Sequence, residues 1–467
     1  MTTVDAKKKI KAKPLLYRQY CKACFRCIDC CPKHCITEGT EIEPATGFIP
    51  VVIDLDTCNG CGLCISACPE PYALLPLEPD AEAPENPAIL AGTRITPLPE
   101  PKEVPATRIP MPDLEPMVLK GNHAAAVGAI MAGCRHVFGY PITPSTEGAE
   151  LMARLLPELH GVFFQAVSEV ATVNMMYGCG GAGTPCMTFT SSPGFSLMLE
   201  GISYMIGAEV PGVFINVMRG GPGLGNIAPE QGDIKLVCRG LGHGNTHALV
   251  LAPSTPQEML DLTIDAFELS FKYKNPVIIC GDGYLGQMTS RVTLPKEMVK
   301  PGLPAWAVNG DAEHRGNLIS SFYLQEAILE ERNIMLNEKY ATITENEQRA
   351  ETFFGDDAEW LVIACNTPAR MAKGAVQALR DNGIKAGLFR PISLWPFPIK
   401  QLLPVLDGVR GFVVVEAGSG QLEDEVRLAL SHANVHNPPP FHNVRHYGGV
   451  LPQQQEIVDK VTALVEG

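Results

Sequence analysis

Short apolar runs alternate with amphipathic stretches along most of the chain after residue 117. The runs are bounded by glycine and proline, which is typical of buried strands, and the stretches between them repeat with the period of a helix. Strands are predicted at 137–140, 162–165, 186–190, 213–218 and 276–280. Helices are predicted at 122–132, 147–156, 168–178 and 256–272. Strands that alternate with helices predict a parallel sheet covered on both faces.

A second region with the same alternation begins near residue 359. Its predicted strands are 361–365, 385–392 and 412–416, and its predicted helices are 369–382 and 422–431. Glycines at several of the turns are typical of open, doubly wound sheets. A proline- and tryptophan-rich turn is expected at 394–398. Residues 291–354 are irregular at first and then charged and helical over 324–350, so we expect a connector there.

The residues before 117 have a different composition. Residues 76–116 are dense in proline, glutamate and alanine, and such a stretch predicts an extended, semi-rigid linker. A short strand is predicted at 48–55, within the cysteine-rich segment. The predicted fold class is therefore α/β, with two doubly wound α/β domains preceded by a small α+β domain. The predicted domains are 1–75 (cysteine-rich), 76–116 (linker), 117–290 (first α/β), 291–354 (connector) and 355–467 (second α/β).

Two runs of cysteine near the N-terminus share one spacing, C-x2-C-x2-C-x3-C followed by proline. This spacing is typical of two-cluster ferredoxins, in which the fourth cysteine of each run binds the cluster held by the other run. We therefore expect two [4Fe-4S] clusters, which carry electrons one at a time. The expected ligands of one cluster are Cys21, Cys24, Cys27 and Cys68. The expected ligands of the other are Cys58, Cys61, Cys64 and Cys31.

Zinc and disulfide bonds are the alternative interpretations of these cysteines. A zinc site usually needs only two close pairs of ligands, whereas each run here has three close cysteines and the proline. Two further thiols, Cys30 and Cys35, lie beside the first run. Cys30 could replace Cys31 as a ligand, but the proline of the motif, Pro32, follows Cys31.

Charge and hydropathy exclude several classes of function. The formal net charge is −14 at pH 7, which argues against nucleic acid as a partner. Crowded cysteines without a signal peptide indicate a reducing compartment, so a cytoplasmic location is expected. No apolar run approaches the roughly 18–20 residues of a membrane-spanning helix, so we expect no membrane association.

Polar and glycine-rich motifs follow four of the predicted strands. They are GYPITPSTE at 139–147, SE at 168–169, TSSPGF at 190–195 and RGGPGLG at 219–225. Because ligands bind at the carboxyl ends of strands in α/β folds, we expect these motifs to gather along one edge of the sheet. Each motif alone is also compatible with a structural role, such as capping a helix.

Read in order, GYPITPS, QAVSEV, TFTSSPGFSLMLE and MRGGPGLGNIAPEQGD resemble motifs of the α subunit of 2-oxoacid:ferredoxin oxidoreductases, which are thiamine-diphosphate enzymes. The resemblance covers about residues 117–290, as a domain that binds the thiamine pyrimidine. Residues 359–430 resemble the second domain of that subunit, which is similar to the C-terminal domain of transketolase. The cysteine-rich module is similar to a ferredoxin-like subunit that is usually encoded separately and is fused in front here.

The resemblance implies roles for individual side chains. Glu169 matches the glutamate that hydrogen-bonds N1′ of the thiamine aminopyrimidine, which takes the proton from C2 of the thiazolium. Thr143 matches the threonine that contacts the 2-oxo acid, and Arg219 matches the arginine that holds its carboxylate. The further residues implied to contact the cofactor are Pro141, Ser192 and Gly194.

The implied reaction is the CoA-dependent oxidative decarboxylation of a 2-oxo acid to an acyl-CoA and CO2. The electrons would pass through the clusters to an external ferredoxin or another acceptor. Gly281-Asp282-Gly283 with Asn309 only partly resembles the motif that binds Mg2+ and diphosphate, because a second asparagine is missing. We therefore expect a β subunit to carry that motif, together with another [4Fe-4S] cluster, and a γ subunit to complete the complex.

The loop after Arg219 bears on the substrate. Its sequence Gly-Gly-Pro-Gly-Leu-Gly replaces the Gly-Pro-Ser-Thr-Gly associated with 2-oxoglutarate enzymes and is more similar to the branched-chain group. A branched-chain or aryl 2-oxo acid is therefore expected as the substrate. 2-Oxoglutarate is the alternative substrate, and a non-catalytic electron-transfer or scaffold subunit is the alternative function.

Overall fold

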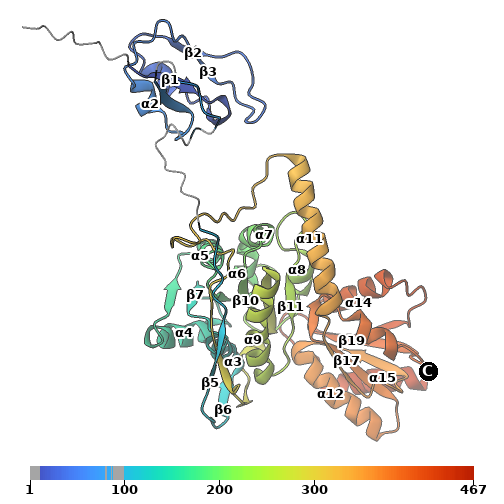
Figure 1. Ribbon diagram of the computed structural model, residues 1–467. Helices are drawn as coiled ribbons and strands as arrows, with labels where there is room; N and C mark the ends of the chain where they lie inside the picture. The colour runs from blue at the N-terminus through green and yellow to red at the C-terminus, as the bar shows by residue number, and fades with distance from the viewer. Residues whose placement is uncertain (1–10, 79–80, 86, 88–98) are drawn as a thin grey trace, which may run out of the picture. The chain divides into compact units, whose positions relative to one another are not determined.

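The structure is a computed structural model that describes residues 11–78, 81–85, 87 and 99–467 (Figure 1). The chain divides into two compact units, Met1–Pro99 and Glu100–Gly467. The first unit contains both cysteine runs, and the second contains both α/β regions. Part of the predicted linker, namely 79–80, 86 and 88–98, lies outside the described residues.

The first unit consists of short elements around the cysteine runs. A short helix begins one residue before the third cysteine of each run, and two antiparallel strand pairs complete the unit. The helices are α1 (Arg26–Asp29) and α2 (Leu63–Ala67), and the pairs are β1 (Lys13–Leu16) with β4 (Leu74–Leu77) and β2 (Ile36–Glu38) with β3 (Val51–Ile53). Ile36, Val51 and Leu74 pack with the cysteines, so the thiols lie in a small apolar core.

A seven-stranded sheet forms the centre of the second unit, with the order β18-β11-β12-β10-β9-β7-β8. All of its strands are parallel except β18, which pairs antiparallel with β11. The strands are β7 (His136–Gly139), β8 (Val162–Gln165), β9 (Cys186–Thr190), β10 (Gly212–Met218), β11 (Leu249–Leu251), β12 (Pro276–Asp282) and β18 (Ser393–Trp395). Strands β9, β10 and β12 are buried throughout, as their continuous apolar runs predict.

Helices connect these parallel strands by crossovers, which are right-handed in α/β folds. The winding direction reverses after β8 and again after β11, so the crossovers after β7 and β11 lie on one face of the sheet and those after β8, β9 and β10 lie on the other. Accordingly, α3 packs with α4 and α9, whereas α5 packs with α7. The helices are α3 (Gly121–Met131), α4 (Thr146–Glu158), α5 (Glu169–Gly181), α6 (Ser192–Leu197), α7 (Leu199–Gly207), α8 (Ile234–Arg239), α9 (Pro256–Tyr273) and α10 (Gly283–Gln287). The expected doubly wound α/β fold is confirmed.

The second α/β region has a five-stranded sheet with the order β15-β17-β16-β19-β20. Its strands are β15 (Ala350–Phe353), β16 (Trp360–Ile363), β17 (Ala386–Pro391), β19 (Gly411–Glu416) and β20 (Phe441–Arg445). The helices are α12 (Asn366–Asp381), α13 (Ile399–Leu402), α14 (Gln421–His432) and α15 (Gln454–Glu466). Only β15 is antiparallel, so this region is also an α/β sheet.

Strand β18 corrects the expectation of a turn at 394–398. Its residues cross from the second α/β region to the large sheet, where they pair with β11. Both strands are three residues long, which is too short to show a periodic pattern, and for that reason the sequence did not reveal them. The second α/β region therefore contributes one strand to the large sheet of the first.

Two antiparallel strand pairs lie at the boundaries of the first α/β region, and the pair of 107–110 with 297–300 joins the predicted linker to the predicted connector. They are β5 (Thr107–Pro110) with β14 (Glu297–Lys300) and β6 (Met117–Lys120) with β13 (Thr289–Val292). The last part of the linker is therefore paired rather than free, which local sequence patterns could not show. The charged part of the connector forms α11 (Glu326–Asn346). Within the described residues, no helix is both long and apolar enough to cross a lipid bilayer.

Candidate active site

Four loops meet at one edge of the large sheet because the strands before them are parallel neighbours. In the sheet these strands follow the order β8, β7, β9 and β10. Thr143 follows β7, Glu169 follows β8, Ser192 follows β9 and Arg219 follows β10. The chain reverses its winding direction between β7 and β9, and α/β sheets open a ligand crevice at such a switch point.

Glu169 is the first residue of α5 and only 5% exposed. Ser168 caps the helix, because its Oγ accepts a hydrogen bond from the backbone N–H of Ala171 at 3.2 Å. Within the described residues, the Glu169 carboxylate forms no ion pair and accepts no hydrogen bond. A buried carboxylate with free acceptor capacity can bind a donor supplied by a ligand.

Gly194, in α6, lies directly against this carboxylate. A Cβ atom at Gly194 would lie 2.6 Å from Glu169 Oε1 and 2.5 Å from Thr190 Oγ1. The Thr190 hydroxyl is buried and has no hydrogen-bond partner among the described residues. Two polar groups with free hydrogen-bonding capacity therefore face each other across a glycine, in a space that a side chain would fill.

The Arg219 guanidinium is held by two backbone carbonyls. Nη1 donates to the carbonyl of Thr143 at 2.8 Å, and Nη2 donates to the carbonyl of Leu224 at 3.0 Å. No acidic side chain of the described residues pairs with it, and Nε is buried without a partner. The positive charge is thus fixed in position but not neutralised, which suits a guanidinium that binds an anionic ligand.

The turn that carries Thr143 is held in place by hydrogen bonds from two side chains. The carbonyl of Pro144 accepts hydrogen bonds from Asn122 Nδ2 at 2.7 Å and from Gln287 Nε2 at 3.3 Å. Asn122 is fully buried, whereas Pro141 and Thr143 are exposed at the surface of the turn. The turn therefore presents Thr143 at the sheet edge, in contact with Arg219.

Ser192 connects Arg219 to a buried carboxyl group. Its Oγ accepts a hydrogen bond from the backbone N–H of Arg219 at 3.0 Å. Burial raises the pKa of Asp233, although hydrogen bonds from Ser192 and Asn216 lower it in part. Asn216 Nδ2 donates to Asp233 Oδ2 at 2.9 Å.

Sequence reasoning missed the residues that support the site, which are Asn122, Gln287, Asn216 and Asp233. Signals for two of them were present in the sequence. Asn216 interrupts the apolar run of β10, and Asp233 lies in the quoted motif after Arg219. Nothing in the sequence indicates that Asn122 and Gln287 converge on one carbonyl.

The loop after Arg219 contacts the second α/β region at two points. Asn226 Nδ2 donates to the carbonyl of Gly448 at 2.8 Å. Gln231 is fully buried, with Nε2 donating to the carbonyl of Cys365 at 3.1 Å and Oε1 accepting from Ala417 N at 2.9 Å. The second region therefore holds the loop that positions Arg219.

Asp282 belongs to the motif that only partly resembles a metal-binding motif, and its carboxylate is hydrogen-bonded within the protein. Its Oδ1 accepts hydrogen bonds from the backbone of Tyr284 and Leu285, and Oδ2 accepts one from Thr367 N at 2.9 Å. Thr367 Oγ1 also donates to Oδ1 at 2.8 Å. The side chain is 1% exposed, so both oxygens are occupied by the protein.

The structure gathers Cys21, Cys24 and Cys27 with Cys68. Burial raises the pKa of Cys27 to about 11, and the thiolates of Cys21, Cys68 and Cys24 contribute to this rise. The same four cysteines line a small cavity. The fourth cysteine of the second run therefore lies with the first three of the first run, and soft thiolates are the ligands that iron–sulfur clusters use.

The remaining thiols form a second group around Cys58, Cys61 and Cys64. Burial raises the pKa of Cys64 to about 11, with contributions from Cys30, Cys58 and Cys61. Burial raises the pKa of Cys31, but backbone N–H groups and the Cys35 thiol lower it more, so that the net pKa falls. Cys30 therefore reaches this group directly, whereas Cys31 lies 3.4 Å from the sulfur of Cys35, which in turn lies beside Cys58.

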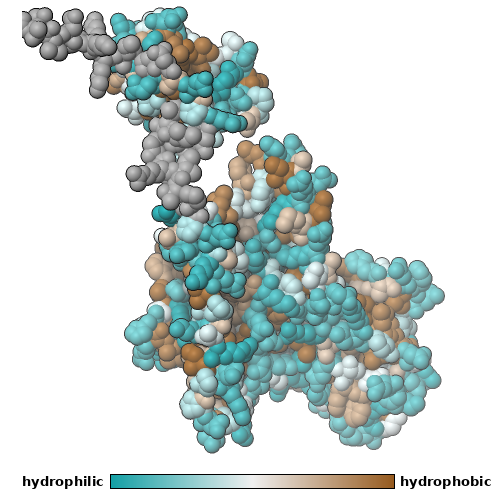
Figure 2. Space-filling view, in the orientation of Figure 1, coloured by the Kyte–Doolittle hydropathy of each residue, from teal (hydrophilic) through white to brown (hydrophobic). Residues whose placement is uncertain are grey.

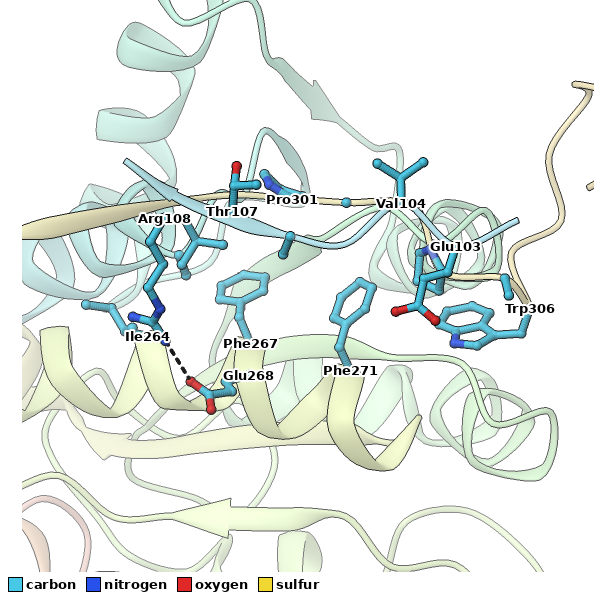
Figure 3. A pocket seen from close by; sticks show the side chains of 16 residues that line it. Glu103, Val104, Thr107, Arg108, Ile264, Phe267, Glu268, Phe271, Pro301 and Trp306 are labelled. Atoms are coloured by element: carbon cyan, nitrogen blue, oxygen red, sulfur yellow. Dashed lines mark ion pairs between the residues drawn. The ribbon is translucent and has the colours of Figure 1, made fainter. Parts of the chain in front are cut away.

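A separate cavity of about 420 Å³ lies between the β5–β14 pair and α9 (Figure 3). The rings of Phe267, Phe271 and Trp306 line it, and the ion pair of Arg108 with Glu268 (3.6 Å) lies at its rim. None of the predicted site residues lines this cavity. It is therefore distinct from the edge of the sheet where Glu169 and Arg219 lie.

Three known protein families match the chain. Residues 127–352 match pyruvate flavodoxin/ferredoxin oxidoreductase, thiamine diP-bdg, and residues 358–457 match pyruvate:ferredoxin oxidoreductase core domain II. Residues 50–70 match a 4Fe-4S binding domain. The first two matches correspond to the two α/β regions, and the third contains the second cysteine run.

Individual relatives agree with these matches. The chain is 45% identical over 346 residues to ketoisovalerate oxidoreductase subunit VorB of Methanothermobacter thermautotrophicus, covering 74% of this chain and 96% of the relative. It is 37% identical to 2-oxoglutarate synthase subunit KorA of Archaeoglobus fulgidus, covering 76% of this chain and 99% of the relative.

Among solved structures, a 2-oxoglutarate:ferredoxin oxidoreductase from Magnetococcus marinus matches with a TM-score of 0.67 and 25% identity. This match covers 75% of this chain and 65% of that chain. The resemblance inferred from the motifs is confirmed. The chain belongs to the 2-oxoacid:ferredoxin oxidoreductases, as a subunit with a thiamine-diphosphate-binding domain and a 4Fe-4S binding domain.

Proposed function

We propose that this chain is the α subunit of a 2-oxoacid:ferredoxin oxidoreductase that converts a branched-chain or aryl 2-oxo acid and CoA to an acyl-CoA and CO2. The observation that carries this proposal is the Arg219 guanidinium, which is fixed by two carbonyls and has no acidic partner among the described residues. Its remaining N–H groups can pair with the carboxylate of a 2-oxo acid. Thr143, whose carbonyl Arg219 binds, lies within reach of the same substrate.

Glu169 is proposed to hold the aminopyrimidine of thiamine diphosphate through N1′. The cofactor, when bound, supplies the nucleophilic carbon that attacks the 2-oxo group and accepts the electrons released after CO2 leaves. The buried carboxylate would accept a hydrogen bond from N1′–H and thereby stabilise the imino tautomer of the pyrimidine, which is the form that can take the proton from C2. The proposed remaining contacts are Pro141, Ser192 and Gly194, and the free space next to Gly194 supports them.

The loop of residues 220–229 supports a branched-chain substrate. It contains no charged side chain, and it exposes the apolar side chains of Leu224 (83%) and Ile227 (61%). A second carboxylate, as in 2-oxoglutarate, would find no cation in this loop, whereas an isopropyl group would find apolar contacts. The relative named ketoisovalerate oxidoreductase subunit agrees with this preference.

A substrate panel tests the proposal. The purified complex is assayed with CoA, a viologen acceptor and each of 3-methyl-2-oxobutanoate, an aryl 2-oxo acid and 2-oxoglutarate. We expect the highest kcat/KM for 3-methyl-2-oxobutanoate or the aryl acid. A preference for 2-oxoglutarate would contradict the substrate assignment, and turnover of none of the 2-oxo acids would contradict the catalytic assignment.

A β subunit is proposed to complete the active site. Asp282 uses both carboxylate oxygens internally, so the diphosphate and Mg2+ are assigned to a partner that carries the full metal-binding motif and a further cluster. Apolar side chains are available for such contacts at the segment leading into α11, where Figure 2 shows brown atoms. The most exposed are Leu318 (87%), Phe322 (73%) and Leu324 (80%).

The cysteine-rich unit is proposed to hold two [4Fe-4S] clusters. The two groups of thiols described above support this assignment, with Cys21, Cys24, Cys27 and Cys68 in one and Cys58, Cys61 and Cys64 in the other. Cys31 is assigned as the fourth ligand of the second cluster because in two-cluster ferredoxins the fourth cysteine of each run binds the cluster held by the other run. The clusters would supply one-electron transfer to an external ferredoxin or another acceptor. A γ subunit completes the proposed complex.

A further inference from the structure

Cys35 is a thiol that the two expected ligand sets leave unused. Its side chain is 6% exposed and lies in the apolar core of the first unit with Ile36, Val51 and Leu74. Its sulfur is 3.4 Å from the sulfur of Cys31, within hydrogen-bonding distance for a thiol. Cys35 therefore contacts directly one of the proposed cluster ligands.

The backbone around Cys35 is rigidly placed. The residue immediately precedes β2, whose Ile36 is paired with Ile53 of β3. The carbonyl of Cys35 accepts a hydrogen bond from Asp54 N at 2.8 Å, which extends this strand pairing by one step. The pairing of β2 with β3 therefore fixes the backbone position from which the Cys35 side chain reaches Cys31.

The corresponding position of the other cysteine run differs. Cys35 lies four residues after Cys31, and the residue four positions after Cys68 is Tyr72. The Tyr72 ring packs edge-on against Tyr20, with centroids 6.0 Å apart. In the described residues, the only hydrogen-bonding contact of the Cys68 sulfur is the carbonyl of Glu70 at 3.6 Å. Only one of the two proposed clusters thus has a neighbouring thiol at this position.

We propose that Cys35 donates an S–H hydrogen bond to the ligand sulfur of Cys31 and thereby raises the reduction potential of that cluster above the potential of the other. This inference rests on the proposed function, in which Cys31 is a ligand. Reduction adds negative charge to the cluster and its sulfurs, and a hydrogen-bond donor stabilises that charge. Cys35 acts through Cys31 and is a positioning residue rather than a ligand.

Potentiometric titration followed by EPR of the full complex tests this inference. We expect two reduction steps for the cysteine-rich unit in the unmodified protein. In Cys35→Ala the step at higher potential should move to lower potential, while the iron content stays the same. Cys35→Ser retains an O–H donor and should restore much of the difference. Thr37→Ala, an exposed position in β2, is the control and should leave both steps unchanged.

The outcomes separate this inference from the proposed function. Full iron content with an unchanged potential in Cys35→Ala would overturn the role of Cys35 and leave the cluster assignment intact. Loss of half of the iron in that variant would also overturn it, because Cys35 would then be a ligand. Absence of iron from the anaerobically purified unmodified protein would overturn the cluster assignment itself.

Discussion

Gly194 brings the polypeptide so close to Glu169 that a methyl group at this glycine would lie 2.6 Å from the carboxylate oxygen. The two residues come from different loops, after β9 and after β8, and they meet because both loops leave the same edge of the sheet. The glycine is therefore required for the position of the carboxylate and not for an unusual backbone conformation. This close approach makes the Glu169 pocket sensitive to a single added methyl group.

Gly194→Ala should sharply reduce turnover, because the new Cβ forces the Glu169 carboxylate or the α6 backbone to move. Gly178→Ala is the matched control, since Gly178 lies in the same helix as Glu169 and a Cβ there would contact nothing within 4 Å. That control should retain activity and gain up to about 1 kcal/mol of stability from its higher helix propensity. Steady-state assays and thermal unfolding of both variants provide the comparison. Equal activity of the two variants would show that turnover does not depend on the free space between Gly194 and the Glu169 carboxylate.

Glu169→Gln should reduce turnover at least ~100-fold, because the amide keeps the shape of the side chain but can neither exchange a proton with N1′ nor stabilise a protonated N1′ with a negative charge. Iron content and assembly with partner subunits should not change. Glu150→Gln, at an exposed position of α4, is the control and should behave as the unmodified protein. Near-normal turnover of Glu169→Gln would favour a scaffold role for this chain.

Arg219→Lys should raise the substrate KM and lower kcat/KM. An ammonium group cannot bind the carbonyls of Thr143 and Leu224 and also present a two-pronged donor to a carboxylate. Initial-rate kinetics with several 2-oxo acids measure the effect, with Arg154→Lys in α4 as an exposed control. Unchanged kinetics with every 2-oxo acid would remove Arg219 from the substrate site.

Asp282→Ala should lower stability rather than cofactor affinity. The change removes the cap of α10 and the hydrogen bonds to Thr367, which together are worth about 2–4 kcal/mol. Thermal unfolding measures the loss, and calorimetry of the unmodified chain alone with Mg2+ and thiamine diphosphate should show no tight binding. Binding should appear when the β subunit is added. Tight Mg2+-dependent binding to the chain alone, lost in Asp282→Ala, would contradict the division of the site between subunits.

Iron and sulfide analysis of the anaerobically purified chain should give about eight of each per chain, from two complete sets of four cysteines. The protein should be brown, and its broad absorbance should bleach with dithionite. Zinc in place of iron would refute the cluster assignment. About four irons per chain would show that only one of the two sets of four cysteines binds a cluster.

The central strands and the polar loops could be predicted from the sequence because local patterns mark them. Strand β10 is buried on both faces, so its apolar run is unbroken except at Asn216, and the motifs after β7, β8, β9 and β10 mark where these strands end. Because these strands are parallel neighbours, their carboxyl ends bring Thr143, Glu169 and Arg219 to the same edge of the sheet. The structure brings Thr143 into contact with Arg219 as this reasoning expects, while their catalytic roles stay predictions.

The parts that could not be predicted depend on partners distant in the sequence. The β5–β14 pair joins the predicted linker to the predicted connector, on either side of the first α/β region in the sequence, and neither strand has a distinctive pattern. In the same way, the carbonyl of Pro144 receives two amide donors that lie far apart along the chain. Local periodicity carries no information about such pairings, because it describes only which face of an element is apolar.

The strand that the second α/β region contributes to the large sheet determines which fragments of this protein can fold. Strand β18 comes from the second α/β region but completes the sheet of the first, and the buried side chains of Gln231 and Asn366 are hydrogen-bonded to each other where the two regions meet. A break in the chain after residue 354 would leave β11 with an open edge and buried amides without partners, so neither fragment would be a stable protein by itself. A fragment of this protein that is to fold must therefore contain both α/β regions.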